Sequence, residues 1–487
     1  MSQTELPRNA ILLGLKRGFF LKNKFNLIGS KEWLPYQKSW FRYQDESKFI
    51  QDTVRFFSLP GPSRPPVFYQ GNSLDKFIDI TKENSLIYSD SADQFQYALI
   101  DLRDQIQNIT TVLEYDELRS NLFDLVNNLF AKLEDRRFIT VVAQNKFLEG
   151  YYYPIAWDLS YVVSEIYSLK DEKIGCLEDG HSYPKLMDNQ AGSSHFYVLN
   201  FRKDDLSKGI ADHIIPRQFS LNAITKSDTR YPKWFILKPQ RRNKEEILHP
   251  AKYPEDLIEL FVSYFSNVND NVYDPMSGTG STQIGAMKLG RNGYGTELSE
   301  YFGNIAINRC QEFIRPTQVS LFEEKLQVIS RIEISDAKNF AKFEFPKQHL
   351  LITSPPYWDM LNMKGAENQA KRIKSGLQTN YSDSEDDLGN INDYNLFVEK
   401  LADLYKQLSN ILEDDARVVI VVKNIKKKGS NYPFAWDLSK MLQPNFVLAE
   451  ESFWLQDDIS IAPFGYGNTW VSNTFHQYCL TFIKKSN

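Results

Sequence analysis

The stretch NVYDPMSGTGSTQIGAMKLGRNGYGTELSEYF, from Asn271 to Phe302, has the pattern of a strand, a glycine loop, a helix and a second strand. The loop SGTG (Ser277 to Gly280) predicts a tight turn, because glycine is needed where φ is positive or where a ligand touches the backbone. Ser281 or Thr282 is expected to cap the helix that follows. The second strand ends in Glu297, and a carboxylate about 20 residues after a glycine loop is the usual partner of ribose hydroxyls in a Rossmann-like sheet.

This spacing favours a nucleotide-type cofactor over the alternative of a structural glycine turn with a surface glutamate. The loop reads GTG rather than GxGxxG, which makes a dinucleotide less favoured. A further strand, RIEISDAKNF (Arg331 to Phe340), is expected to end in Asp336. A carboxylate there suits an adenine amino group and, equally, the cap of a helix.

A second motif lies at the end of another apolar run, KQHLLITSPPYWDM (Lys347 to Met360). This run predicts a buried strand followed directly by Ser354-Pro355-Pro356-Tyr357. Two successive prolines end the strand and stiffen the backbone. They also leave main-chain carbonyls without partners in a helix or sheet.

An internal repeat organises the rest of the chain. Residues 115–160 align without gaps with residues 394–439, at an offset of about 279, and roughly 18 of the 46 paired positions are identical. The leucines at 122, 125, 129 and 133 match those at 401, 404, 408 and 412, and this spacing predicts the apolar face of a helix in each copy. Alternating runs that begin at His195 and His476 predict one further strand in each copy. Each copy is therefore expected to contain a helix, a strand, a polar loop, a second helix and a final strand.

Taken together and in this order, DPMSGTG, TELSE, DA and TSPPYW resemble the amino-group DNA methyltransferases, and the resemblance covers residues 249–485 well. It implies a Rossmann-like α/β domain with a mixed seven-strand sheet whose last strand is antiparallel, preceded by a partial degenerate α/β repeat. The cofactor implied is S-adenosyl-L-methionine, and the catalytic residues implied are Ser354, Pro355, Pro356 and Tyr357. The cofactor-binding residues implied are Asp274, Ser277, Gly278, Thr279, Gly280, Glu297 and Asp336, with His249 and Tyr253 from the helix before the loop.

The same resemblance implies direct methyl transfer to an exocyclic amine. The Ser354 hydroxyl and the Pro355 carbonyl are expected to accept the hydrogen bonds of that amine. Tyr357 is expected to stack on a base flipped out of the duplex, and Trp358 either extends that wall or is structural. Methylation at C5 of cytosine uses a cysteine, usually after proline, and none of the three cysteines follows one. Serine at the first tetrapeptide position favours N4 of cytosine over N6 of adenine within the family.

The first copy of the repeat lacks both the glycine loop and SPPY; the nearest string is SRPPVF (Ser63 to Phe68). The segments follow one another as catalytic half, cofactor half and catalytic half, and we interpret this order as a circular permutation by duplication. The first copy would then be recruited for DNA binding or as a pseudo-subunit. The alternative is that it completes a second sheet for stability alone. The domains expected are an N-terminal region (1–110), the degenerate repeat (111–204), a basic linker or DNA-contact region (205–248) and the catalytic domain (249–487).

Composition narrows the class of protein. The chain has 487 residues, of which 42% are apolar, and a net charge of −5. Its three cysteines, at positions 176, 310 and 479, form no CxxC pair, which argues against a disulfide framework or a structural zinc site and fits a reducing cytosol. No run of about 18 apolar residues predicts a membrane span.

Double-stranded DNA is the expected partner, and a cognate restriction endonuclease or other defence-system subunits are further partners implied. Positive charge gathers at three places: residues 217–244 (eight Lys or Arg against one acid, with Tyr231 and Trp234 interleaved), Lys423 with Lys426 to Lys428, and Lys364 to Lys374 just after SPPY. Basic and aromatic residues together suit phosphate contact and base stacking. An N6-adenine enzyme, an RNA amino methyltransferase and a silent DNA-binding subunit remain as alternatives.

Overall fold

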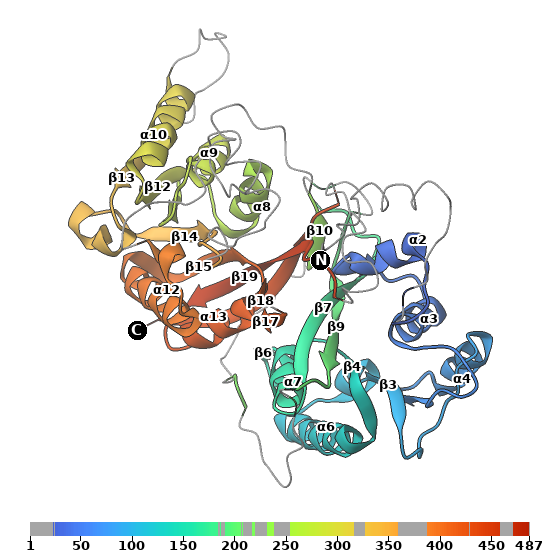
Figure 1. The fold of residues 1–487 in the computed structure, drawn as a ribbon. Coiled ribbons are helices and arrows are strands. Elements are labelled where there is room, and N and C mark those ends of the chain that lie inside the picture. The colour runs from blue at the N-terminus through green and yellow to red at the C-terminus, as the bar shows by residue number, and fades with distance from the viewer. Residues whose placement is uncertain are drawn as a thin grey trace, which may run out of the picture.

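Within the residues that the structure describes, nine strands form the larger sheet, in the order β13-β12-β11-β14-β15-β19-β18-β10-β8 (Figure 1). The structure is a computed structural model, and it describes residues 23, 25–183, 186, 190–205, 207, 217–219, 231–237, 254–315, 327–358, 387–427, 429–457 and 471–486. The strand before the glycine loop, β11 (Asn271–Asp274), and the strand before the tetrapeptide, β14 (Gln348–Thr353), are parallel neighbours.

The chain reverses its winding direction between these two strands. From β11 it continues on one side through β12 (Asn292–Glu297) and β13 (Ser330–Ile334), and it then crosses β11 to form β14 and β15 (Leu412–Val422), all of them parallel. Such a switch point opens a crevice at the carboxyl ends of the strands, where open α/β sheets bind ligands. Both motifs found in the sequence leave the sheet at this place.

The antiparallel end of the sheet confirms the expected mixed topology. The last strand, β19 (His476–Lys484), lies antiparallel between β15 and β18 (Phe446–Leu455). Seven strands, from β13 to β18 in the sheet order, correspond to the sheet that the sequence predicts. Two short strands, β10 (Trp234–Ile236) and β8 (Ala191–Gly192), extend it to nine among the described residues.

Helices cover both faces of this sheet (Figure 1). On one face, α8 (Glu255–Phe265) packs on α9 (Ser281–Lys288) and buries Leu257, Ile258 and Phe261 against the strands. On the other face lie α12 (Tyr394–Leu408) and α13 (Phe434–Leu442). The four leucines predicted to form the apolar face of the α12 segment, at 401, 404, 408 and 412, are all buried.

The first copy of the repeat forms a second sheet of its own. Its strands are β1 (Trp40–Arg42), β2 (Val67–Gln70), β3 (Phe95–Asp101), β4 (Leu133–Ala143), β7 (Ser168–Leu177) and β9 (Ser194–Arg202). They are ordered β1-β7-β9-β4-β3-β2, which matches β10-β18-β19-β15-β14-β11 of the larger sheet strand for strand. The helices α6 (Val112–Lys132) and α7 (Ile155–Ser164) correspond to α12 and α13. The duplication in the structure is therefore wider than the segment in which the sequence repeat is recognisable.

The remaining described elements are short or peripheral. They are the helices α2 (Ser30–Trp33), α3 (Glu46–Phe57), α4 (Leu74–Glu83), α5 (Arg103–Asn108) and α10 (Glu300–Ile314), the 3-10 turns η1 (Leu34–Gln37), η3 (Ala337–Phe343), η5 (Leu388–Asn390) and η6 (Ser409–Ile411), and two hairpins, β5 (Lys146–Leu148) with β6 (Tyr151–Tyr153) and β16 (Ile425–Lys427) with β17 (Ser430–Tyr432).

Strand register identifies which residues of the first copy stand where SPPY stands in the second. Thr353 pairs with Ile420, and Ile100 pairs with Val141, which is the repeat equivalent of Ile420. The residue after Thr353 is Ser354, so its equivalent is Asp101. The first copy thus has Asp101-Leu102-Arg103-Asp104 at the tetrapeptide position. SRPPVF, the nearest string in the sequence, does not occupy this position: it runs into β2, the equivalent of β11, whereas the tetrapeptide position follows β3, so its likeness to SPPY is a coincidence.

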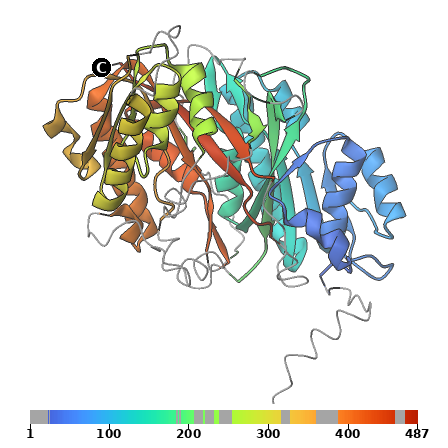
Figure 2. The same ribbon diagram turned by 90° about the horizontal axis from the view of Figure 1, so that it is seen from above.

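The two sheets lie side by side and share their core (Figure 2). One cluster of buried apolar residues runs without a break from α6 and α7 to α12 and α13. At its centre Trp157 and Trp436, which are equivalent in the repeat, stack with ring centroids 6.0 Å apart and an interplanar angle of 19°. The three cysteines are buried and free. Over the described residues, no helix has the length and hydropathy that a membrane crossing requires.

Candidate functional site

The glycine loop starts at a buried carboxylate. Asp274 ends β11 and accepts hydrogen bonds from the Met276 amide (3.0 Å) and from the Thr282 hydroxyl (2.6 Å). Thr282 therefore ties the helix to the strand and does not cap it. The cap of α9 is Gly280, with φ +81° and no side-chain hydrogen bond, which corrects the expectation of a Ser281 or Thr282 cap.

Glu297, at the end of β12, lies against this loop. Its Oε2 accepts the Gly278 amide at 2.7 Å, and its Oε1 accepts the Ser299 amide at 2.9 Å. Burial raises the pKa of Glu297 to about 7, although the hydrogen bonds from Ser299 and Gly278 lower it; the carboxylates of Asp274 and Asp387 raise it further. Each carboxylate oxygen retains an acceptor site, so the group can still receive two hydroxyl donors.

Two hydroxyls at the glycine loop are buried and, within the part of the chain that the structure describes, unpaired. Thr279 Oγ1 and Ser281 Oγ are buried and have no hydrogen-bond partner among the described residues. Buried polar atoms normally have a partner, so both hydroxyls retain unused hydrogen-bonding capacity next to the glycine loop. Ser277 is used differently: its hydroxyl donates to the Asp274 carbonyl (3.1 Å) and accepts from Gln283 (2.9 Å), which holds the turn in place.

Asp336 lies at the same edge of the sheet, one strand beyond Glu297. The strand β13 ends at Ile334, opposite Glu297, so the expectation that it reaches Asp336 was two residues too long. Asp336 Oδ1 accepts the Lys338 amide at 2.9 Å and caps η3. The side chain is partly exposed, and Oδ2 also faces the Lys338 ammonium at 3.4 Å.

The tetrapeptide follows β14 on the other side of β11. The Tyr357 hydroxyl donates to Gln477 Oε1 (2.7 Å) and lies 3.2 Å from Ser354 Oγ. A tyrosine carries one hydroxyl hydrogen, so Ser354 is the donor in the second contact. Burial raises the pKa of the Tyr357 phenol well above its ordinary value, which keeps it neutral. The Ser354 oxygen therefore has both lone pairs left to accept hydrogen bonds from another molecule.

A strained residue locks the backbone just after the tetrapeptide. Trp358 has φ +53°, which is rare for a bulky side chain. Its ring is 6% exposed, its indole nitrogen donates to the Asn392 carbonyl (3.1 Å), and the Lys427 ammonium lies 3.6 Å from its ring centroid. The indole packs against Tyr394 and Tyr432. Of the two roles weighed for Trp358, the structural one is correct.

A sequence model of DNA methylases, of the N6 and N4 type, matches residues 69–308, about half of the chain. The chain belongs to the N6/N4 DNA methylase family. The match begins in β2, takes in most of the first copy and the glycine loop, and ends within α10, so the tetrapeptide lies beyond it.

Curated relatives of this chain are similar over short segments. The Type II methyltransferase M.BglII of Bacillus subtilis is 37% identical over 73 residues, which is 15% of this chain and 20% of the relative. The orphan methyltransferase M.BamHII of Bacillus amyloliquefaciens is 32% identical over 101 residues, 20% of this chain and 38% of the relative. The chain thus spans well under half the length of either relative. A magnesium protoporphyrin IX methyltransferase from Synechocystis, solved with bound SAH, is 13% identical over 50% of this chain and 83% of its own, with a TM-score of 0.28.

Parts of the site expected from the sequence fall outside the described residues. These are His249, Tyr253, the basic segment from Lys364 to Lys374, and Lys226, Arg230, Lys238, Arg241, Arg242, Lys244 and Lys428. Three described residues of the first basic cluster do not form a DNA surface. Tyr231 and Trp234 are fully buried, and Lys233 forms an ion pair with Glu450. Their aromatic and basic character serves the core around β10, which corrects the expectation of base stacking there.

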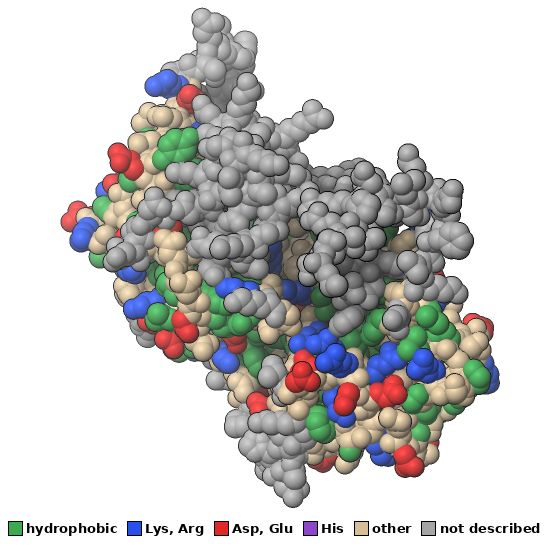
Figure 3. All heavy atoms as spheres, in the orientation of Figure 1, with side chains coloured by type: hydrophobic (Ala, Val, Ile, Leu, Met, Phe, Trp, Pro, Cys, Tyr) green, Lys and Arg blue, Asp and Glu red, His purple; other side chains and the backbone are tan. Residues whose placement is uncertain are grey.

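The second basic cluster contains one lysine close to the tetrapeptide. Lys423 lies 5.3 Å from the Tyr357 ring centroid, and burial lowers its pKa. Lys426 instead forms an ion pair with Asp171 of the first copy. On the face shown in Figure 3, Lys and Arg side chains lie among Asp and Glu side chains over the described surface.

Gln477 is a site residue that the sequence reasoning missed. It lies on β19, 120 residues from Tyr357, and no local motif marks it. The usable signal is the repeat: the first-copy equivalent of Gln477 is Phe196, because His195-Phe196-Tyr197 matches His476-Gln477-Tyr478. A polar residue that replaces a buried aromatic in one copy alone indicates a task that the other copy does not perform.

Proposed function

We propose that this protein is an S-adenosyl-L-methionine-dependent methyltransferase that modifies N4 of cytosine in a base flipped out of double-stranded DNA. The observation that supports this most directly is the meeting of two motifs. The glycine loop after β11 and the tetrapeptide after β14 leave neighbouring parallel strands, Tyr273 being paired with Leu351, at the switch point of the sheet. This is the position where open α/β sheets bind ligands.

The residues of the crevice fit the proposed cofactor. Glu297 would accept the two ribose hydroxyls, and Asp336 is placed one strand further for the adenine amino group. The hydroxyls of Thr279 and Ser281, buried without a partner among the described residues, supply further polar contacts. When bound, S-adenosyl-L-methionine would supply the electrophilic methyl group.

Ser354 and Pro355 act on the amine that receives the methyl group. The lone pair of an exocyclic amine is conjugated into the ring, which makes the amine a weak nucleophile. The Ser354–Tyr357–Gln477 chain of hydrogen bonds leaves the Ser354 oxygen free to accept. This oxygen and the Pro355 carbonyl accept the two amine hydrogens. Acceptors fixed in advance stabilise positive charge as it develops on nitrogen, without reorganisation during the reaction. Tyr357 supplies a ring against which the flipped base stacks.

The choice of cytosine rests on the serine at the first tetrapeptide position, since hydrogen-bond acceptance suits the adenine amine equally well. Adenine N6 is the alternative within the same chemistry. A cognate restriction endonuclease or other defence-system subunits are the partners that this function implies.

The test is transfer of labelled methyl from S-adenosyl-L-methionine to mixed genomic DNA and, separately, to RNA, followed by digestion to nucleosides and mass spectrometry. We expect N4-methylcytosine from the DNA. N6-methyladenine would move the target base, label in RNA alone would move the substrate class, and no label in either would favour a silent DNA-binding subunit.

Replacement of Gly280 by alanine tests the cofactor cradle. Alanine at φ +81° costs about 1–2 kcal/mol of folding free energy, and its Cβ would lie 3.1 Å from the Ala306 Cβ, so the loop must shift. We expect a lower melting temperature and at least tenfold weaker binding of S-adenosylhomocysteine, measured by calorimetry.

Gly429→Ala is the matched control for Gly280→Ala. Gly429 has φ +77°, and a Cβ there meets nothing within 4 Å. This variant should show the backbone cost alone and bind the cofactor product normally. Equal affinity in the two variants would contradict the assignment of the loop.

A further inference from the structure

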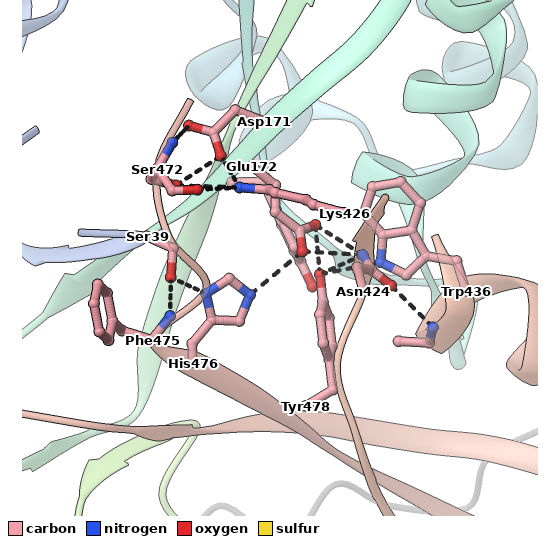
Figure 4. A network of polar contacts seen from close by, with 12 residues as sticks. Ser39, Asp171, Glu172, Asn424, Lys426, Trp436, Ser472, Phe475, His476 and Tyr478 are labelled. Carbon is pink, nitrogen blue, oxygen red and sulfur yellow. Dashed lines mark hydrogen bonds and ion pairs between the residues drawn. The ribbon is translucent and has the colours of Figure 1, made fainter. Parts of the chain in front are cut away.

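The two copies contact each other through a reciprocal pair of glutamates. Glu172 on β7 of the first copy accepts from Asn424 Nδ2 (3.0 Å to each oxygen) and from the Tyr478 hydroxyl (2.8 Å) of the second (Figure 4). Its repeat equivalent, Glu451 on β18, accepts from Asn145 (2.6 Å) and the Tyr197 hydroxyl (2.5 Å) of the first copy. Glu172 and Glu451 are 279 residues apart, the offset of the repeat.

The reciprocity extends to the tryptophans and hairpins of the interface. Trp436 donates to Tyr478 (3.1 Å), and Trp157 donates to Tyr197 (2.8 Å), while the two indoles stack on each other. The hairpin strand β17 lies against β7, and its equivalent β6 lies against β18. An interface in which each side presents the same residues to the other is the arrangement of a twofold homodimer. Here it lies within one chain.

Only one side of this interface adjoins the tetrapeptide. Gln477, whose Oε1 accepts from Tyr357 (2.7 Å), lies between His476 and Tyr478 on β19. In the first copy its equivalent is Phe196, and the Arg103 guanidinium lies 4.6 Å from that ring. Arg103 is itself held by Asp101, at the Ser354 position, and by Glu46. The first copy has therefore replaced the acceptor geometry of the tetrapeptide by an ion cluster.

Residues of the first copy hold both neighbours of Gln477. Tyr478 donates to Glu172, and His476 Nε2 faces Glu172 Oε1 at 3.4 Å. Ser39 Oγ accepts the Phe475 amide (2.8 Å) and forms a second hydrogen bond with His476 Nδ1 (2.8 Å), as Figure 4 shows. Since successive strand residues point to opposite faces, anchoring 476 and 478 fixes the direction of Gln477.

We propose that the first copy is a built-in second subunit, and that its Glu172 positions Gln477 and, through it, Tyr357 and Ser354 for methyl transfer. Glu172 is a positioning residue, because it touches neither the base nor the cofactor site. The inference rests on the proposed function for its catalytic consequence. The competing explanation is that the first copy stabilises the fold and nothing more.

Glu172→Gln and Glu451→Gln form a matched pair that separates these explanations. Each removes one buried carboxylate from the same kind of network, so both should lower the melting temperature by similar amounts. We expect Glu172→Gln to lower kcat about tenfold, the effect of a misdirected acceptor, with KM for DNA and cofactor affinity within about twofold of the parent. Glu451→Gln should retain the parental kcat.

A coupling measurement and an activity-independent measurement complete the test. In a Gln477→Ala background, Glu172→Gln should cause no further loss of kcat, because both changes break one path. Amide hydrogen exchange at Tyr357 and Trp358 should accelerate in Glu172→Gln and stay parental in Glu451→Gln. If the parent transfers no methyl group, the proposed function fails, and the exchange rates alone still decide the positioning role. Equal effects of the two glutamate variants on kcat or on exchange would overturn the inference.

Discussion

Replacement of Ser354 by alanine is expected to lower kcat by about 100–1,000-fold, the range found when one fixed acceptor or donor is removed from a developing charge. The Ser354 oxygen is the only side-chain acceptor of the tetrapeptide apart from the Tyr357 hydroxyl, which already receives the Ser354 hydrogen. Its loss leaves the amine with the Pro355 carbonyl alone. Because the lost contact forms with the reacting amine, KM for DNA and the affinity for S-adenosylhomocysteine should change by less than about threefold.

Ser439→Ala is the matched control for this variant. Ser439 is a buried serine of α13 whose hydroxyl donates to the Ala435 carbonyl at 2.7 Å within the helix. Its removal should leave kcat at the parental value. Single-turnover rates on DNA would be compared for the two variants and the parent. A Ser354→Ala rate within about threefold of the parent would show that the tetrapeptide serine does not receive the amine.

The sheet and the position of both motifs could be predicted from the sequence for a physical reason. A glycine loop between a buried strand and a helix, with a carboxylate closing the next strand, leaves few alternatives to a Rossmann-like arrangement. The leucine spacing around Leu401 and the alternation from His476 are likewise local signals, and local periodicity determines element type. These parts agree with the structure.

The details that failed depend on contacts distant in sequence. Thr282 has the chemistry of a helix cap, but the buried Asp274 carboxylate competes for its hydroxyl at 2.6 Å. Tyr231 and Trp234 have the composition of a stacking surface, yet both are buried. Trp234 lies in β10, which pairs with β18, and Tyr231 packs against aromatic rings of α8. A charge or ring pattern does not reveal whether its partner is a ligand or the core.

Glu297 connects cofactor binding to pH, and the sign follows from its environment. In the free protein its pKa is raised from 4.5 to about 7, chiefly by burial. Hydroxyl groups that donate to the carboxylate favour its ionised form, so a bound ribose lowers that pKa and binding releases a proton. Affinity for S-adenosylhomocysteine is therefore expected to rise by up to about tenfold per pH unit as pH rises towards 7, and to level off above about 8.

Stability should respond to pH in the opposite direction. The pKa of Glu297 is higher in the folded state than in the unfolded state. Its contribution to stability is therefore complete at pH values below the unfolded pKa of 4.5, and it is lost as pH rises through the folded pKa of about 7. The shift corresponds to about 3 kcal/mol. The free protein thus bears the cost of a buried charge at neutral pH, which a ligand with two hydroxyl donors offsets.

Glu297→Gln isolates this group, because glutamine keeps the size of the side chain and does not titrate. We expect this variant to bind S-adenosylhomocysteine about 100-fold more weakly at pH 8, since charged hydrogen bonds to two hydroxyls are lost. Its remaining affinity should lack the rise between pH 6 and 8. Calorimetry at several pH values measures both properties, and proton release is read from heats in buffers of different ionisation enthalpy. A parental affinity that falls over this pH range, or a glutamine variant with the parental profile, would assign the pH dependence to another group and remove Glu297 from the ribose site.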